Sequence, residues 1–344
     1  MNQRNFSIDL LRVIAAFGIV WLHVSHGMVT AAAGMKVSSW WMATFADAMS
    51  RWCVPVFVMI SGSLLLSKSS SGTLFSFYHR RVVKLLFPLV FWTAFYLGFK
   101  YCLCGRLDGV KELKLVYEGQ PYYHLWYLYM IICLYMVTPF IYYFVKNCSR
   151  QLLFWAVVVS FFMASVNSIL KSIENGWTSS FFASWPPFVG YFLCGYYITT
   201  YRPAFFRHKA VWVIAAACWI ALALVTGLLF PVLGHRAWEV MYRSLNPLII
   251  GMSVCIFGAV WSPDSPALTK QTFIRRLING IAPLTMGIYL AHPALMHFSK
   301  SIGVSELFGN PPLSIPFSTL FVFTLSAAAA FLMSLVPGLR RVVK

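Results

Sequence analysis

Charged side chains are scarce in this chain of 344 residues: only 10% are Asp, Glu, Lys or Arg, and just nine are acidic. Hydrophobic residues make up 60%, and the mean hydropathy is +0.73. A water-soluble domain needs far more polar surface, so this composition excludes one. The long apolar runs also lack the alternation of apolar and polar residues that a membrane β-barrel requires. Because lipid offers the backbone no hydrogen-bond partners, we expect transmembrane helices.

Disulfides are not expected to organise the fold, although the chain has eight cysteines. Five of them fall inside apolar stretches: Cys53, Cys133, Cys194, Cys218 and Cys255. Cys102 and Cys104 form a C-x-C pair near a helix end, where lone thiols are usually inert. We therefore predict neither a disulfide framework nor a metal site.

Ten segments come near the roughly 20 residues that cross a bilayer. They are predicted at 7–27, 41–66, 82–103, 124–145, 151–170, 183–200, 210–230, 243–261, 282–299 and 314–336. No stretch between them is long enough for a second domain. The expected fold class is thus an all-α polytopic membrane protein of about ten transmembrane helices, with residues 1–344 as one integral membrane domain.

Basic residues are unequally divided between the two sides of these spans. The N-terminal side and every second loop hold seventeen Lys and Arg against two acidic residues, whereas the opposite side holds ten and seven. The positive-inside rule then places both termini in the cytoplasm. The net charge of +18 is explained by topology, so nucleic acid is not expected as a partner, whereas membrane lipid is. The sequence does not indicate an oligomeric state.

The first span, within the segment from Arg4 to Gly27, contains Asp9, Arg12 and His23. Arg12 and His23 are eleven residues apart, which puts both on one helix face with about 16 Å between their Cα atoms. In one interpretation, Arg12 pairs with Asp9 as a membrane anchor and His23 is a hydrogen-bond partner of another helix. In the other, Arg12 binds a phosphate and His23 transfers protons. An extended thioester carrier would span this gap.

Two further segments suggest contacts with a ligand. The stretch from Arg51 to Gly62 starts with an Arg predicted near the periplasmic side, and Ser61 and Gly62 would let a backbone or a ligand approach closely. Arg80, Arg81 and Lys84 cluster at the cytoplasmic mouth of the third span. Such clusters commonly set topology, and they also suit a polyphosphate such as the nucleotide end of coenzyme A.

Candidate acceptor contacts lie toward the opposite face. His124 and Trp126 open the fourth span, where an aromatic belt is expected and where a sugar ring could stack. His292 is predicted mid-membrane before Pro293, where it binds either freed carbonyls or a substrate. Glu239 lies four residues before Arg243, which suggests an ion pair or a carboxylate that orients a histidine.

Taken together, these motifs resemble the acyltransferase 3 family of membrane-bound O-acyltransferases over essentially the whole chain. The resemblance rests on D-x-x-R-x10-H ending at His23, R-x-x-V-P-x-F-x-x-I-S-G from Arg51 to Gly62, H-L-W-Y-L at 124–128, and G-I-Y-x-x-H-P at 287–293. Within the family the chain is most similar to short, single-domain members such as the enterobacterial common antigen O-acetyltransferases. Each motif is weak alone, and the combination is specific.

The resemblance implies a bacterial inner-membrane O-acetyltransferase of cell-envelope polysaccharide biosynthesis. It implies acetyl-CoA as the cytoplasmic acyl donor, without a metal, and a periplasmic glycan, often lipid-linked, as the acceptor. We expect Arg12 and His23 to be catalytic. The donor contacts are predicted at Arg12, Ser61, Arg80, Arg81 and Lys84, and the acceptor contacts at Arg51, His124, Trp126, Glu239 and His292.

Two mechanisms and two rival functions stay open at this point. His23 acts either as general base on a sugar hydroxyl or as a transient acyl carrier. Arg12 is too far from His23 to stabilise the oxyanion, so His292, a tyrosine hydroxyl or backbone donors are expected to do so. The rivals are a transporter or flippase of a glycan lipid, with His23 as proton relay, and a structural subunit of an export complex.

Overall fold

The computed structural model describes residues 5–30, 36–67, 73–173, 185–261, 273–304 and 310–344. Within these ranges every regular element is a helix. The expected all-α class is therefore confirmed.

The helices differ widely in length. The long ones are α1 (Phe6–Thr30), α5 (Lys84–Cys104), α7 (Trp126–Asn147), α8 (Arg150–Ile173), α10 (Ala210–Leu233) and α15 (Pro311–Leu335). The shorter α-helices are α2 (Val37–Ser50), α3 (Cys53–Ser67), α4 (Leu74–Tyr78), α6 (Gly109–Tyr117), α9 (Val189–Tyr201), α11 (Arg236–Met241), α12 (Pro247–Val260), α13 (Phe273–Ile281), α14 (Thr285–Ser301) and α16 (Pro337–Val343). A π-helical turn, η1 (His79–Val83), joins α4 to α5, and 3₁₀ turns cover η3 (Pro186–Phe188), η4 (Ala204–Arg207) and η6 (Ala282–Leu284).

Seven helical segments of the described chain are long and apolar enough to cross a membrane. They are Phe6–Thr30, Val37–Ser67, Leu74–Cys104, Trp126–Asn147, Arg150–Leu170, Ala210–Leu233 and Pro311–Leu335. The other three predicted spans coincide with α9, α12 and α14, which have 13, 14 and 17 residues. A multi-pass membrane protein is thus confirmed, whereas the total of ten and the cytoplasmic termini stay predictions. Six charges used to assign the sides lie outside the described residues, on Arg4, Lys68, Glu174, Asp264, Lys270 and Glu306.

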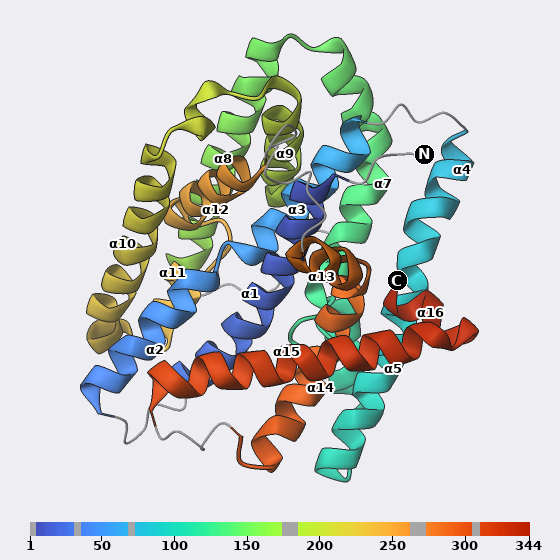
Figure 1. Cartoon of the computed structure of the whole chain (residues 1–344), viewed down its shortest axis with the longest axis vertical. Helices are drawn as coiled ribbons and strands as arrows, with labels where there is room; N and C mark the ends of the chain where they lie inside the picture. The colour runs from blue at the N-terminus through green and yellow to red at the C-terminus, as the bar shows by residue number, and fades with distance from the viewer. Residues whose placement is uncertain (1–4, 31–35, 68–72, 174–184, 262–272, 305–309) are drawn as a thin grey trace.

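Helix α1 occupies the middle of the bundle (Figure 1). It packs against α2, α3, α14 and α15, so its faces are largely covered by protein. Helices α8, α9, α10 and α12 lie to one side of it, and α5 and α7 lie to the other. Helix α15 runs across α1 and α14 at a steep angle to the other long helices. Asp9 on α1 is accordingly buried within the protein, as the cost of charge in lipid requires.

Helices α3 and α9 approach one another closely because each presents a glycine at the crossing. A Cβ atom on Gly62 would lie 1.9 Å from the Phe192 carbonyl oxygen, and one on Gly195 would lie 2.0 Å from the Met59 carbonyl oxygen. The sequence predicted that Ser61 and Gly62 would let a backbone or a ligand come close. In the structure the backbone of α9 approaches Gly62. Small residues at such crossings let helices pack by van der Waals contact, which drives association in lipid.

This contact predicts a large difference between two glycine-to-alanine variants. Gly195→Ala should lower stability by about 1–3 kcal/mol, because the two backbones must separate. Gly98→Ala, on the open face of α5 with nothing within 4 Å of its added Cβ, is the control and should gain about 0.5–1 kcal/mol of helix propensity. Thermal unfolding in detergent measures both. Equal melting temperatures for the two variants would contradict the close approach.

Candidate functional site

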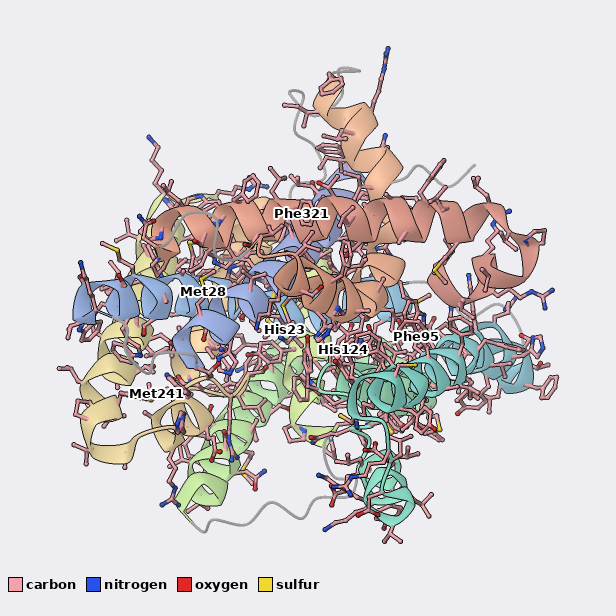
Figure 2. The ribbon with its side chains drawn as sticks, turned by 90° about the horizontal axis from the view of Figure 1, so that it is seen from below. His23, Met28, Phe95, His124, Met241 and Phe321 are labelled. Carbon is pink, nitrogen blue, oxygen red and sulfur yellow. The ribbon has the colours of Figure 1, made fainter. Side chains whose placement is uncertain are left out.

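Three histidines from separate parts of the chain meet beside α1. The ring of His23 on α1 stacks on that of His292 on α14, with centroids 5.1 Å apart and planes at 23°. The ring of His124, just before α7, lies 5.5 Å from that of His292. Figure 2 places His23 and His124 side by side in the middle of the molecule. The structure therefore brings together the three histidines predicted as site residues, His23, His124 and His292.

Tyrosines and main-chain carbonyls hold this cluster in place. The Tyr289 hydroxyl donates to the carbonyl of His124, and the Tyr96 hydroxyl donates to the carbonyl of Leu290 at 2.6 Å. His292 Nδ1 lies 2.6 Å from the Tyr289 carbonyl oxygen. A carbonyl can only accept, so Nδ1 carries the proton and neutral His292 presents a lone pair at Nε2. In that state His292 does not donate to an oxyanion, which leaves the other expected donors for that role.

Several nitrogens of the cluster have no protein partner. Among the described residues, His292 Nε2 and both ring nitrogens of His124 are buried without a well-formed hydrogen bond. The nearby Leu290 carbonyl already accepts from Tyr96. Buried polar atoms are almost always bonded, so unpartnered ones grouped beside a cavity are typical of a ligand site. The ring faces of His23 and His292, rather than their nitrogens, oppose each other, and no group in the described chain is arranged to hold a metal.

A cavity of about 610 Å³ opens from His23. Its volume is within the usual range for small-molecule sites of about 300–1,000 Å³. Of the sequence-predicted site residues, it is lined by His23, Arg51, His124, Trp126 and Glu239. Further polar and aromatic residues on its walls include His26, Tyr123, His235, Trp238 and Tyr242. Aromatic faces together with hydroxyl, carboxylate and guanidinium groups are suited to a polar ring such as a sugar.

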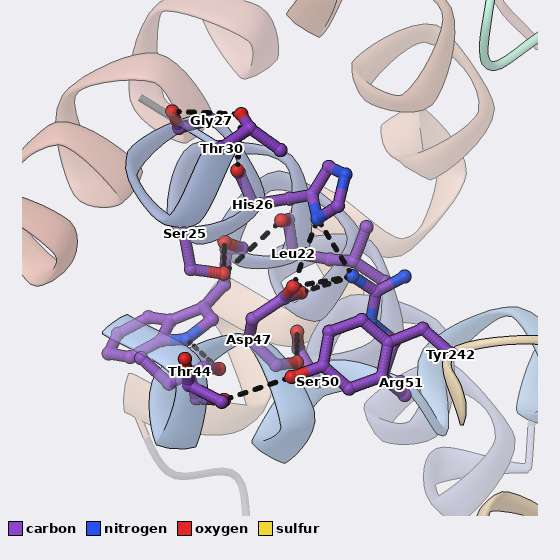
Figure 3. Close-up of polar contacts among 12 residues, drawn as sticks. Leu22, Ser25, His26, Gly27, Thr30, Thr44, Asp47, Ser50, Arg51 and Tyr242 are labelled. Atoms are coloured by element: carbon purple, nitrogen blue, oxygen red, sulfur yellow. Dashed lines mark hydrogen bonds and ion pairs between the residues drawn. The ribbon is translucent and has the colours of Figure 1, made fainter. Parts of the chain in front are cut away.

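Arg51 lies inside the protein, at the junction of α2 and α3, with 12% of its side chain exposed. Its predicted place near the periplasmic side stays a prediction. Its Nη2 is 2.6 Å from each carboxylate oxygen of Asp47, and its guanidinium carbon is 4.0 Å above the Tyr242 ring (Figure 3). His26 Nδ1 bonds the same carboxylate at 3.0 Å. Asp47 is fully buried, so this group of charges is balanced within the protein, as burial demands.

Glu239 lies on the short helix α11 at the mouth of the cavity. Arg243 follows four residues later, lines the same cavity and donates from Nε to the Glu239 carbonyl oxygen at 2.9 Å. The ion pair predicted between these two side chains, or the orientation of a histidine by Glu239, stays a prediction. Trp126, the first residue of α7, supplies an aromatic wall of the cavity.

Arg12 and Ser61 lie outside the cavity, on the side toward the N-terminal end of α1. Arg12 Nη1 is 3.4 Å from Asp9 Oδ1, and 35% of its side chain is exposed. The Ser61 hydroxyl accepts from Tyr135 at 3.3 Å. Tyr127, which lines the cavity, is close to both Ser61 and Arg12. Tyr127 therefore connects the cavity wall to the two predicted donor contacts.

Arg80, Arg81 and Lys84 are exposed on the π-helical turn and the start of α5. Arg80 bonds Ser76 through its Nε and Nη2 atoms at 3.1 and 3.0 Å. The Tyr78 hydroxyl ties this segment to α7 by donating to the Met136 carbonyl. These cations do not line the cavity, so they are not brought together with His23. A π-helical turn is a frequent mark of functional sites, and here it carries two of the three cations.

Sequence reasoning did not select Asp47, His26, Tyr123 or Tyr289 as site residues. Two signals could have found the first pair: Asp47 precedes Arg51 by one helical turn, and His26 follows His23 by three residues. No signal in the sequence points to Tyr123, whose ring lies 4.9 Å from that of His23. That contact depends on the path of the segment before α7.

A family model described as an acyltransferase domain matches residues 5–332. The chain belongs to the acyltransferase 3 family. The match includes every element of the cavity, from α1 to α14. The family expected from the Arg12–His23 spacing and the three other motifs is therefore confirmed.

One curated relative of this acyltransferase 3 chain is the nodulation protein NolL of Sinorhizobium fredii (strain NBRC 101917 / NGR234), 23% identical over 229 residues. The alignment covers 64% of this chain and 58% of NolL, so the chain spans less than two thirds of that relative's length. No solved structure matches.

The buried charges predict that a single variant of this acyltransferase 3 protein loses much more stability than a double variant. Arg51→Ala should destabilise it by about 3–5 kcal/mol, because the fully buried Asp47 carboxylate loses its main partner. Asp47→Asn combined with Arg51→Gln removes both charges and should recover much of that loss. Melting temperatures in detergent provide the comparison. A double variant no more stable than Arg51→Ala would show that the charge pair does not control stability.

Proposed function

We propose that this chain is an O-acyltransferase, in particular an O-acetyltransferase, of the bacterial inner membrane. It moves an acyl group from cytoplasmic acyl-CoA to a hydroxyl of a periplasmic or lipid-linked glycan in cell-envelope polysaccharide biosynthesis. The observation that carries the proposal is the position of His23. It stacks on His292, which packs in turn against His124, and it lines a cavity on the same helix and face as Arg12.

The donor is proposed to bind along α1 from its N-terminal end. Arg12 has an exposed portion that can bind a phosphate, and its Cα lies about 16 Å from that of His23. A pantetheine arm has a comparable length, so its thioester would reach the histidines past Tyr127 and Ser61. Arg80, Arg81 and Lys84 are proposed to attract the nucleotide end, and their exposure fits a long-range role.

The acceptor is proposed to occupy the cavity. Trp126 offers a face on which a sugar ring can stack, while Arg51, Glu239 and His124 offer polar contacts. A hydroxyl bound there would lie near His23, where the thioester arrives from the opposite direction. Two substrates held from opposite sides need no large movement to react.

The chemistry exchanges a thioester for an ester. His23 serves either as general base toward the hydroxyl or as a nucleophile that carries the acyl group. The developing oxyanion needs hydrogen-bond donors, and neutral His292 offers only a lone pair at Nε2. His124, with two unpartnered ring nitrogens, or the hydroxyl of Tyr123 is the better placed donor.

His23→Ala tests the central residue. Membranes that carry the wild-type protein should transfer radiolabelled acetyl from acetyl-CoA into envelope glycan, and His23→Ala should lower this transfer by about 100-fold or more. Equal expression is checked by immunoblot. Wild-type membranes that neither transfer nor hydrolyse any of a panel of acyl-CoAs would contradict the proposal and favour a glycan-lipid transporter.

Arg12→Ala should act mainly on donor binding. Loss of a charged hydrogen bond of about 1.5–3 kcal/mol raises KM for acetyl-CoA by about tenfold or more, and Arg12→Lys should keep part of the affinity. Arg207→Ala, an exposed cation away from α1, is the matched control. Steady-state kinetics at varied acetyl-CoA provide the measurement. A lower kcat with unchanged KM would argue against phosphate binding by Arg12.

A further inference from the structure

A second imidazole, paired with a carboxylate, lies one helical turn beyond His23 on α1. His26 Nδ1 is 3.0 Å from Asp47 Oδ2, and Asp47 on α2 is completely buried (Figure 3). The His26 ring lines the cavity, with 37% of its side chain exposed. The carboxylate is therefore hidden behind an imidazole that a cavity ligand can touch.

The hydrogen bonds fix the position of the His26 proton. An ionised carboxylate only accepts, so Nδ1 donates to Asp47. Arg51 Nη2 also lies 3.2 Å from this Nδ1, but Nη2 is closer, at 2.6 Å, to each of the two Asp47 oxygens, which take its two hydrogens. Neutral His26 consequently carries its lone pair on Nε2. A carboxylate on one nitrogen and a lone pair on the other is the arrangement of a general base, since the carboxylate stabilises the imidazolium that forms.

His23 lacks such support. Its ring is packed between the rings of His292 at 5.1 Å and Tyr123 at 4.9 Å, and neither is an anion. In the described chain, no ion pair to His23 is formed, whereas His26 has one. A proton taken up by His23 would therefore lie beside two other histidines with no carboxylate in contact. His26 takes up the same proton in direct contact with the Asp47 carboxylate, which it shares with Arg51.

We propose that His26, held by Asp47, is the base that deprotonates the acceptor hydroxyl. The inference rests on the proposed acyltransferase function and divides the work between the two histidines of α1. As the hydroxyl oxygen bonds to the acyl carbonyl carbon, its proton passes to His26 Nε2. The bond from that carbon to its leaving group breaks, and the leaving group takes the proton back from His26. The leaving group is the thiolate of the donor, or the imidazole of His23 where His23 carries the acyl group.

The residues around the proposed acceptor site agree with this division of roles between His23 and His26. The His26 ring lies 5.9 Å from that of Trp238 in an edge-to-face arrangement, and Trp238 lines the cavity. Tyr242 keeps the Arg51 guanidinium in place from the other side, so the carboxylate that orients His26 is itself fixed.

His26→Ala in the full-length protein tests the inference with radiolabelled acetyl-CoA and envelope glycan. We expect kcat for transfer to fall by about 100-fold or more, because general bases contribute about 10²–10⁴-fold, with KM for acetyl-CoA within about twofold of wild type. Added imidazole should restore part of the transfer, since the site is open to the cavity. His208→Ala, an exposed histidine far along the chain from α1, is the control for a lost imidazole.

Asp47 is a positioning residue, and its variants are tested by measuring kcat and KM separately. Asp47→Asn should lower kcat with KM for acetyl-CoA unchanged, and Asp47→Glu should recover part of it by restoring the carboxylate. If His26→Ala does not fold, His26→Gln takes its place, because Gln keeps a hydrogen-bond donor toward Asp47. Its melting temperature should show that it is folded, while its rate of acetyl transfer should still be low.

The outcomes separate the two proposals. Transfer by His26→Ala or a folded His26→Gln within threefold of wild type would overturn the role of His26 and leave the acyltransferase proposal intact. Loss of activity without recovery by imidazole, together with a lowered melting temperature in both variants, would also overturn it in favour of a structural role. A wild-type protein without any transfer or hydrolysis would instead remove the acyltransferase proposal itself.

Discussion

A polar group inside a bilayer has no water to bind, so it must find its partners within the protein. All regular elements of the described chain are accordingly helices, and α1 is largely covered by other helices. The fully buried Asp47 is tolerated because Arg51 and His26 both bond to it. The cavity walls are therefore made by the same interactions that balance buried charge. Stability and site geometry depend on the same few hydrogen bonds.

The site is assembled from helices that are far apart in the sequence. Helix α1 supplies His23 and His26, the segment before α7 supplies His124, and α14 supplies His292. Each comes with support from elsewhere, such as the Tyr289 hydroxyl on the carbonyl of His124. Unpartnered nitrogens remain at the centre. The histidine rings are thus held by packing against other rings and by hydrogen bonds to the main chain. The unpartnered nitrogens stay available for a ligand.

Much of this arrangement could be predicted. The apolar runs indicated the helices, and seven of the ten expected spans have the full length to cross a membrane. The eleven-residue spacing put Arg12 and His23 on one face, and four motifs indicated the family that the comparison confirms. The Asp47–His26 pair was not predicted, because it joins two helices whose packing no local pattern encodes. The contacts of Arg51 with Asp47 and Tyr242 were not predicted either, since the break between α2 and α3 is invisible to hydropathy.

By itself, the sequence determined the membrane class, the helical periodicity and the family, because these follow from composition and from spacing within single helices. Only the tertiary structure decided which predicted residues share one cavity. It gathered His23, His124, Trp126, Arg51 and Glu239 around the cavity, with His292 behind His23, and left Arg80, Arg81 and Lys84 exposed elsewhere. The physical reason is that contacts between helices depend on side-chain packing and on close approaches such as Gly62 on Phe192. Those contacts join residues that are far apart in the sequence, so the pattern within a single helix does not specify them.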